Sequence, residues 1–351
     1  MSTVAPLRIA MVSYYLPSGS KIGVGHQVHA LANGLVERGH QVTVFSGCGP
    51  SEGALYRTIQ LSLRGALRTF RFANAIRKLD LSDFDVLHAH GDDYWLWRRR
   101  VPVHVRTMHG SCFEEAIRIQ GLKEKARMVA LGLGEELATI VADRTAVVSP
   151  DTRRWMPWVH TVIPNGVDGR RFWPGDVPAE ARPTILFVGT YEQRKRGRLL
   201  MEAFADVVRP LIPDAQLWMV SRDAPTAPGV IQWGRVDDDM LVDLYRRAWV
   251  FCLPSTYEGF GIPYAEALAT GTPVVATSNP GSRYVLDGGR YGILSTDLDL
   301  GQSLVRILGN DKERARLSAL GLQRSERFEL QTVLDCYEQL YRNPTKFKQP
   351  W

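Results

Sequence analysis

The sequence predicts an α/β protein of two domains, each built on a parallel sheet with helices on both faces. Short apolar runs alternate with segments of helical periodicity along most of the chain, which is typical of repeated βα units. The alternation stops at a turn-rich stretch, 163–168, and starts again with a buried run at 184–188. A length of 351 residues also suits two domains of ordinary size.

The expected elements follow from these runs. In the first half we expect strands at 7–12, 41–45, 86–89, 103–107 and 146–148, and helices at 24–37 and 122–141. In the second half we expect strands at 184–188, 216–220, 250–253 and 274–276, and helices at 198–208 and 238–247. The chain closes with a helix at 326–341 and a loose tail at 344–351. These elements place one domain at 1–164, a second at 165–325 and a terminal segment at 326–351.

The composition is that of a soluble globular enzyme. Hydrophobic residues make up 45% and charged residues 23% of the chain, and no apolar run approaches the roughly 20 residues of a membrane-spanning helix. The N-terminus shows no signal peptide, so we expect a cytoplasmic protein. The four cysteines are Cys48, Cys112, Cys252 and Cys336. They form no closely spaced pair, so neither a metal site nor a disulfide framework is indicated.

The net charge of +6 lies wholly in the first half. Residues 1–164 carry 20 Lys+Arg and 14 Asp+Glu, whereas the rest carries 23 of each. A basic half suits an anionic acceptor, an acidic membrane surface or nucleic acid. We favour a solvated face without a partner, and we expect no nucleic acid. Weak docking of the helix-like stretch 63–79, which places Arg64, Arg68 and Arg71 on one face, to anionic headgroups is the alternative.

The most informative motif is E-G-F-G-I-P-Y-A-E, from Glu258 to Glu266. It follows the apolar run at 250–253 and leads into a helical segment, so we expect a strand, a glycine-rich turn and a helix. The N–H groups of such a turn and the helix N-terminus behind it favour an anion. Glu266 is expected in the first turn of the helix, where it either complements the helix dipole or accepts hydrogen bonds from ribose hydroxyls. Together these features predict a nucleotide-diphosphate pocket.

Three consecutive cations, Arg194, Lys195 and Arg196, stand where the strand at 184–188 gives way to a helix. Cations at such a junction suit a diphosphate, because Arg and Lys stabilise the charge that builds on a leaving phosphate. A solvated basic turn is the alternative explanation.

The first half contributes a glycine pair and a histidine. Gly23 and Gly25 stand where a helix begins, so the backbone could approach a phosphate or sugar closely, although a plain helix-entry turn has the same pattern. Val28 replaces the third glycine of a dinucleotide fingerprint and no acidic residue ends the second strand, which argues against NAD or FAD. His109 lies just past the strand at 103–107, where ligands gather in α/β folds, though a lone histidine is more often structural. Of the pair at positions 88 and 90, we expect one histidine to face a cleft and the other to pack.

These motifs, with the segment G-T-P-V-V-A-T at 271–277, resemble those of retaining glycosyltransferases of family 4. The resemblance covers nearly the whole chain. It implies the GT-B fold, in which two Rossmann-like domains face each other and a C-terminal helix crosses back to the first domain. It also implies that the first domain binds the acceptor and the second the nucleotide-sugar. The chain departs from the family at Thr190, which replaces the usual Arg, and at Arg196, which stands at a Lys position.

The resemblance implies roles for the motif residues of the second domain. Glu266 would bind the ribose, and Glu258 would lie near the transferred sugar. Arg196, with Arg194 and Lys195 behind it, would neutralise the diphosphate. The remaining donor contacts would come from backbone groups, those to the phosphate or sugar at Phe260, Gly261 and Ile262, and those to the nucleobase at Arg235 and Val236.

In the first domain, the resemblance implies that His109 hydrogen-bonds the donor sugar near its reacting carbon. The loop with Gly23 and Gly25 would touch the donor phosphate and the acceptor. His109, Glu258 and Arg196 are therefore the expected catalytic residues.

We expect an enzyme that moves a sugar from a UDP- or GDP-linked donor to a hydroxyl of a small-molecule, glycan or lipid-linked acceptor, with retention. No cofactor and no metal are expected, because no D-x-D motif stands in a plausible metal site, and the one at 297–299 comes late and looks like a loop. Two alternatives stay open. One is a nucleotide-sugar epimerase of related fold. The other is a non-catalytic nucleotide- or polyanion-binding protein, for which the missing Arg at position 190 is the hint.

Overall fold

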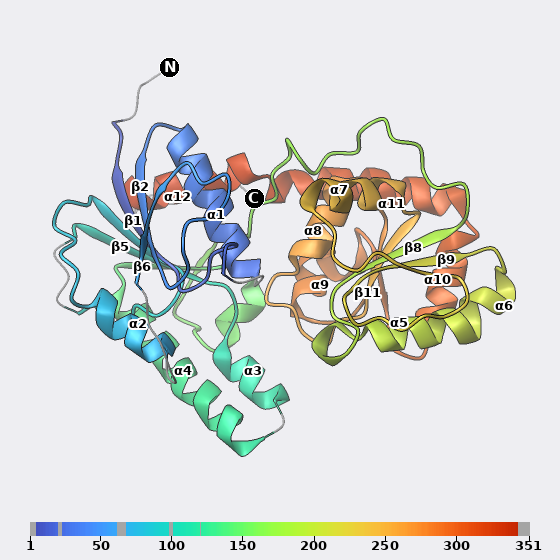
Figure 1. Ribbon diagram of the computed structural model, residues 1–351, viewed down its shortest axis with the longest axis horizontal. Helices are drawn as coiled ribbons and strands as arrows, with labels where there is room; N and C mark the ends of the chain where they lie inside the picture. Colours follow the sequence, from blue (N-terminus) through green and yellow to red (C-terminus); the bar gives the residue numbers. More distant parts are fainter. Residues whose placement is uncertain (1–4, 20–22, 62–67, 98–100, 120, 343–351) are drawn as a thin grey trace. The chain divides into compact units, whose positions relative to one another are not determined.

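The computed structural model describes residues 5–19, 23–61, 68–97, 101–119 and 121–342, and the chain divides into two compact units (Figure 1). The first unit combines Met1–Gly166 with Leu330–Trp351, and the second is Val167–Glu329. Each unit is a parallel sheet with helices on both faces, as the alternation of short apolar runs and helical segments predicted.

The first unit has a seven-stranded sheet in the order β3-β2-β1-β4-β5-β6-β7, and every neighbouring pair is parallel. The strands are β1 (Arg8–Val12), β2 (Gln41–Ser46), β3 (Arg57–Gln60), β4 (Val86–Ala89), β5 (Val103–Met108), β6 (Arg144–Val147) and β7 (Thr161–Val162). Its α-helices are α1 (Gly23–Glu37), α2 (Arg68–Ile76), α3 (Cys112–Arg118), α4 (Leu122–Val141) and α12 (Leu330–Arg342).

The side chains of β1 show how the two faces of this sheet are covered. Ile9 and Met11 are fully buried in one cluster with residues of α1 and α12. Ala10 and Val12 point the other way, into a cluster with residues of α2. Because successive side chains of a strand alternate between the faces, a strand covered on both sides has to be apolar throughout, as β1 is.

The C-terminal helix α12 is held to the first sheet by buried polar contacts as well as by apolar packing. The hydroxyl of Tyr341 lies 2.7 Å from Nδ1 of His88, and Nε2 of His88 lies 2.8 Å from Oγ1 of Thr107. That same Oγ1 lies 2.8 Å from the hydroxyl of Tyr337. At the helix surface, Glu338 lies 2.7 Å from Arg38. His88 is thus the packing histidine of the pair at 88 and 90, and burial lowers its pKa well below the usual value.

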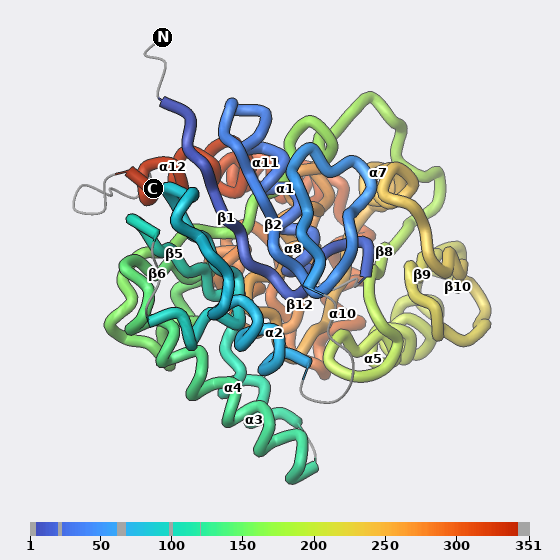
Figure 2. Tube along the Cα trace, turned by 60° about the vertical axis from the view of Figure 1, so that its left-hand side comes forward, coloured from blue at the N-terminus to red at the C-terminus, as the bar shows by residue number. Residues whose placement is uncertain are grey.

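The second unit has a six-stranded parallel sheet in the order β10-β9-β8-β11-β12-β13. The strands are β8 (Thr184–Val188), β9 (Gln216–Val220), β10 (Val230–Gln232), β11 (Val250–Leu253), β12 (Val274–Thr277) and β13 (Ile293–Ser295). Its α-helices are α5 (Gly197–Ala203), α6 (Arg209–Leu211), α7 (Asp238–Arg247), α8 (Ile262–Ala269), α9 (Pro280–Val285), α10 (Leu300–Leu308) and α11 (Asp311–Ser325). The tube in Figure 2 follows both units from a second direction.

The strands that were not predicted are β3, β7, β10 and β13, and all four lie at sheet edges. β3 and β10 are short and have no fully buried residue, so their sequences lack the apolar run of a central strand. The helix predicted at 63–79 appears as α2, whereas residues 62–67, with Arg64, lie outside the described residues. Among the described helices, none is both long and apolar enough to cross a membrane.

The contact between Tyr341 and His88 gives a stability prediction. Tyr341→Phe removes the hydroxyl and leaves Nδ1 of His88 without its partner in the core, so the free energy of unfolding should fall by about 1–3 kcal/mol. Urea unfolding measures the change. Tyr291→Phe is the matched control, because its hydroxyl makes no hydrogen bond with another described residue. Equal stability of Tyr341→Phe and the wild type would show that this contact does not hold α12.

Candidate active site

The carboxylate of Glu258 is the centre of a polar cluster in the second unit. The residue follows β11, and only 6% of its surface is exposed. Its Oε1 accepts a hydrogen bond from Oγ of Ser255 at 2.7 Å and lies 2.7 Å from Nζ of Lys195. Its Oε2 lies 2.8 Å from a guanidinium nitrogen of Arg194. Burial alone would raise the pKa of Glu258, but attraction to the two cations lowers it below its usual value, so the carboxylate is ionised.

The run of three cations is divided between two carboxylates. Arg194 and Lys195 pair with Glu258, whereas Arg196 turns to Asp297, with nitrogen–oxygen distances of 2.6 and 2.9 Å. Arg196 has a left-handed backbone, with φ of 54°, and also donates to the carbonyl oxygen of Pro254 at 2.6 Å. The sequence showed the run, but it could not show which carboxylate each cation meets.

The glycine-rich turn brings the backbone of 259–262 close to neighbouring segments. Gly261 precedes α8 with φ of 93°, a conformation that L side chains rarely adopt, and a Cβ there would lie 2.4 Å from the ring of Tyr264. The N–H of Gly281, in α9, donates to the carbonyl oxygen of Glu258 at 2.8 Å. The ring of Phe260 is buried against Phe328, with centroids 5.4 Å apart, so only its backbone is available to a ligand.

Glu266 lies in α8, but not where we expected it. The helix begins at Ile262, so Glu266 is its fifth residue and stands beyond the first turn, where the dipole contributes little. The prediction of a first-turn position was wrong because the glycine-rich turn ends earlier than the sequence pattern suggested. Oε2 of Glu266 accepts a hydrogen bond from the hydroxyl of Tyr245 at 3.1 Å. Burial raises the pKa of Glu266 to about 7, although Tyr245, Lys195 and Arg171 act against the rise.

The segment expected to read the nucleobase lies in the loop between β10 and α7. Arg235 is exposed there and Val236 is half-buried. The acidic run that follows is explained by the helix itself, because the side chain of Asp237 accepts a hydrogen bond from the N–H of Met240 at 2.8 Å and caps α7.

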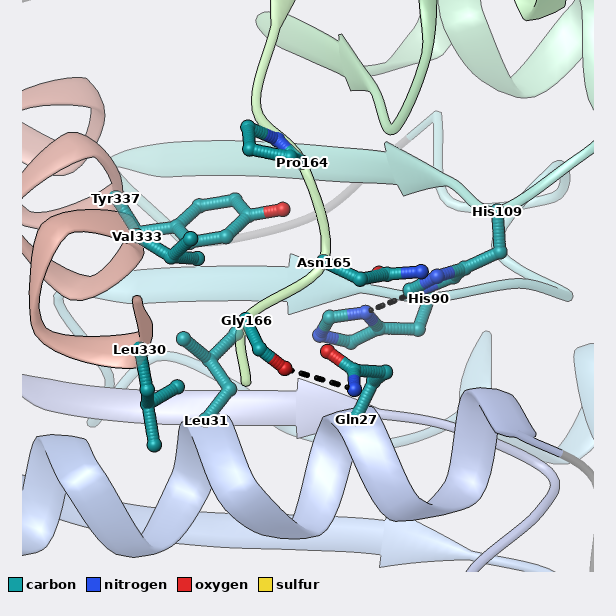
Figure 3. Close-up of a pocket in the computed structure, with 10 residues that line it drawn as sticks. All are labelled: Gln27, Leu31, His90, His109, Pro164, Asn165, Gly166, Leu330, Val333 and Tyr337. Atoms are coloured by element: carbon teal, nitrogen blue, oxygen red, sulfur yellow. Dashed lines mark hydrogen bonds between the residues drawn. The ribbon is translucent and has the colours of Figure 1, made fainter. Parts of the chain in front are cut away.

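In the first unit, His109 pairs with His90. Nε2 of His109 lies 2.9 Å from Nδ1 of His90, and the two rings are stacked with centroids 5.2 Å apart (Figure 3). Burial lowers the pKa of His109 to about 4, which a hydrogen bond from its ring to the side chain of Asn165 partly offsets. Both rings line a pocket whose other walls are formed by Gln27, Leu31, Pro164, Asn165, Gly166, Leu330, Val333 and Tyr337 (Figure 3). One histidine of the pair at 88 and 90 was expected to face a cleft, and His90 is the one that lines this pocket, a choice that sequence alone could not make.

Of the two glycines at the start of α1, Gly23 and Gly25, the second is explained by packing. Gly25 is buried in α1, and a Cβ there would lie 3.1 Å from the backbone of Leu16. Gly25 therefore lets α1 pass close to the segment after β1. Gly23 is the exposed first residue of α1, and residues 20–22 before it lie outside the described residues.

A second charged cluster, which sequence reasoning missed, joins Asp93, in the loop after β4, to His104 and Arg106 of β5. The buried carboxylate of Asp93 pairs with Arg106 and lies 3.0 Å from Nε2 of His104. Its neighbour Asp92 has a left-handed backbone, with φ of 61°, and burial raises its pKa to about 7. Within the described residues, no group of three or more metal-ligating side chains is found.

Comparisons with known proteins agree with this architecture. Residues 22–171 match the model of the family described as Glycosyltransferase Family 4, and residues 182–310 match the model described as Glycosyl transferases group 1. The phosphatidyl-myo-inositol mannosyltransferase of Mycobacterium leprae is 30% identical over 95% of this chain and 96% of its own.

Two solved structures share the fold over nearly the whole chain. The sucrose-phosphate synthase of Thermosynechococcus elongatus has a TM-score of 0.79 at 22% identity and covers 96% of this chain and 99% of its own. Alr3699/HepE of Anabaena, in complex with UDP and glucose, has a TM-score of 0.72 at 16% identity and covers 96% of this chain and 100% of its own. With its two parallel-sheet units and its match to both family models, the chain belongs to the family 4 glycosyltransferases of the GT-B fold.

Proposed function

We propose that this glycosyltransferase transfers a sugar from a UDP- or GDP-linked donor to a hydroxyl group, with retention of configuration and without a metal ion. The observation that carries the proposal is the clustering of Glu258, Arg194 and Lys195 one turn before α8. The two cations and one carboxylate leave a net charge of +1, and the N-terminus of α8 adds its dipole. This arrangement suits an anionic diphosphate.

In this proposal each group of the cluster has a separate task. Arg194 and Lys195 stabilise the negative charge that builds on the leaving diphosphate. The ionised carboxylate of Glu258 fixes both cations and accepts hydrogen bonds from hydroxyls of the transferred sugar. Backbone groups of Phe260, Gly261 and Ile262 contact the phosphate or sugar, as the resemblance to the family implies. The leaving phosphate itself takes the proton of the attacking hydroxyl in a front-face displacement.

In this proposal the first unit binds the acceptor and also contributes His109 to the donor sugar. His109 is neutral at physiological pH because its pKa is about 4, so it hydrogen-bonds the donor sugar without adding charge. We propose a polyol or lipid-linked acceptor, for which the name of the Mycobacterium leprae relative gives the precedent. The half-buried carboxyl group of Asp92, in the loop after β4, suits a hydroxyl group, since a carboxyl oxygen accepts its hydrogen bond.

A donor panel tests the proposal. The full chain is incubated with UDP-, GDP- and dTDP-sugars, and slow release of the nucleotide is measured with and without a polyol acceptor. We expect one donor to release its nucleotide faster than the others. When the sugar of that donor is labelled, we expect the label to appear in the acceptor. Isomerised sugar without transfer would indicate an epimerase instead. Binding of polyanions without hydrolysis of any donor would indicate a non-catalytic protein.

Glu266 is expected to hold the ribose as a carboxylate, so donor binding should depend on pH. Its pKa of about 7 is raised above the usual value, and the group is therefore largely protonated at pH 6 and ionised at pH 8. Affinity for UDP or GDP should rise over this window, and binding at pH 7 should release a proton. In Glu266→Gln the affinity should fall by about 1.5–3 kcal/mol, and the pH dependence should vanish. Calorimetry in buffers of different ionisation enthalpy measures both. Wild-type affinity in the folded variant would remove Glu266 from the site.

Arg196 and Asp297 give a matched pair of variants. If Arg196 leaves Asp297 to reach the diphosphate, Arg196→Ala should lower turnover at least about tenfold, because one charged donor to the leaving group is lost. Asp297→Asn weakens the competing ion pair, so it should leave turnover unchanged or raise it. Steady-state donor hydrolysis and thermal melting are measured for both. If both variants lose turnover and thermal stability to the same extent, the ion pair between Arg196 and Asp297 stabilises the fold, and Arg196 does not act on the diphosphate.

Metal independence is tested by chelation. The cations around Glu258 and the N-terminus of α8 are proposed to assist departure in place of a divalent ion, so EDTA should not change turnover. The control is a titration with Mg²⁺ or Mn²⁺ after dialysis. Activity that is lost with EDTA and restored by either ion would contradict this mechanism.

A further inference from the structure

Helix α4 presents a continuous apolar stripe to solvent. Leu122 is 84% exposed, Val129 38%, Leu133 58% and Ile140 72%. Their spacings of seven, four and seven residues put all four within about 40° of arc on an α-helix. Another face of α4, centred about 120° around the helix from the stripe, is occupied, because Met128, Gly132, Ala138 and Thr139 are buried. A row of large apolar side chains in water over the length of one helix marks an interaction surface.

The stripe is symmetric about its own centre. Leu122 and Ile140 each lie nine residues from position 131, and Val129 and Leu133 each lie two residues from it. When two copies of α4 pack antiparallel about a two-fold axis at this position, Leu122 meets Ile140 of the partner and Val129 meets Leu133 of the partner. Each residue of the stripe then lies opposite an apolar residue of the partner protomer. A surface that complements itself in this way is what an isologous dimer requires.

The charges beside the stripe have the same symmetry. Lys125 and Glu136 lie on the same flank of α4, within about 20° of each other, and are six and five residues from the centre. In the antiparallel pair, Lys125 of each protomer comes opposite Glu136 of the other. The other flank, with Ala126 and Leu137, is uncharged. Charged residues beside an apolar seam select the partner and its direction, as they do in coiled coils.

The same residues disfavour an anionic membrane as the occupant. A helix that lies in an anionic membrane surface has Lys and Arg on its polar face and aromatic or large apolar residues below. The stripe has no aromatic residue, and α4 carries no excess of positive charge, because Glu124, Glu135 and Glu136 balance Lys123, Lys125 and Arg127. The access that a second copy needs is present, because α4 with α3 extends beyond the strands of the first unit (Figures 1 and 2).

From this symmetry we propose that α4 is the interface of a homodimer, in which two copies of the chain pack their α4 helices antiparallel about position 131. One helix pair buries less surface than the roughly 1,600 Å² of a standard interface, so the dimer is weak and forms in the micromolar range.

Sedimentation velocity of the full chain from about 1 to 200 µM tests the proposal, since this range covers the affinity expected of a small interface. A concentration-dependent dimer is expected. Leu133→Glu should raise its dissociation constant at least about tenfold, because a charge then faces Val129 of the partner. Circular dichroism and donor hydrolysis by the monomer serve as controls for folding. A wild type that stays monomeric at the highest concentration would overturn the proposal.

Charge exchange tests the antiparallel register. Lys125→Glu alone, or Glu136→Lys alone, places like charges together twice in the dimer and should weaken it about three- to tenfold. Combining Lys125→Glu with Glu136→Lys restores opposite charges at both places, so the affinity should return close to that of the wild type. A double variant as weak as the single ones would contradict this register. Pelleting of a monomeric wild type with anionic vesicles, lost in Leu133→Glu, would assign the stripe to a membrane and overturn the dimer.

Discussion

The candidate donor site depends on one buried carboxylate. Glu258 is almost inaccessible to solvent, yet it is ionised, because Lys195, Arg194 and Ser255 all bind it. An unpaired charge at such a depth would cost several kcal/mol, so each partner is needed to keep the others in place. The consequence is a pair of cations fixed beside the N-terminus of α8, where a diphosphate would otherwise have to order them itself. Preorganised charge of this kind is the main way in which enzymes stabilise a leaving phosphate.

In the first unit, buried polar side chains are also held in place by one another, but these groups are neutral. His88 and Thr107 are buried in the sheet and are bonded by Tyr341 and Tyr337 of α12, so this helix supplies hydrogen-bond partners to both side chains. His90, two residues further on and just past the end of β4, pairs with His109. Burial keeps these histidines neutral, since it lowers the pKa of each one. The position of His109 therefore depends on packing that extends from the pocket to the C-terminal helix.

The sequence was sufficient for the central strands, since a strand buried on both faces must be apolar, as β1 and β11 are. The sequence was insufficient for features that depend on tertiary packing, such as edge strands and contacts between distant residues. Edge strands such as β3 are half-exposed and have no such run. The motif around Glu258 identified the site, but the partner of Arg196 is Asp297, 101 positions away, and no local pattern connects them. The helix predicted at 122–141 is present as α4, yet its periodicity could not show that the row from Leu122 to Ile140 faces water.

The central claim is that Glu258 and Lys195 act as one unit in donor turnover. A double-mutant cycle tests it most directly, with donor hydrolysis measured in Glu258→Gln, in Lys195→Met and in the variant that carries both. If the carboxylate acts by fixing the cation, the double variant should lose little more activity than the more damaging single one, because the first change already disables the pair. Losses that add independently would show that the two residues act separately, and would contradict the account of this site.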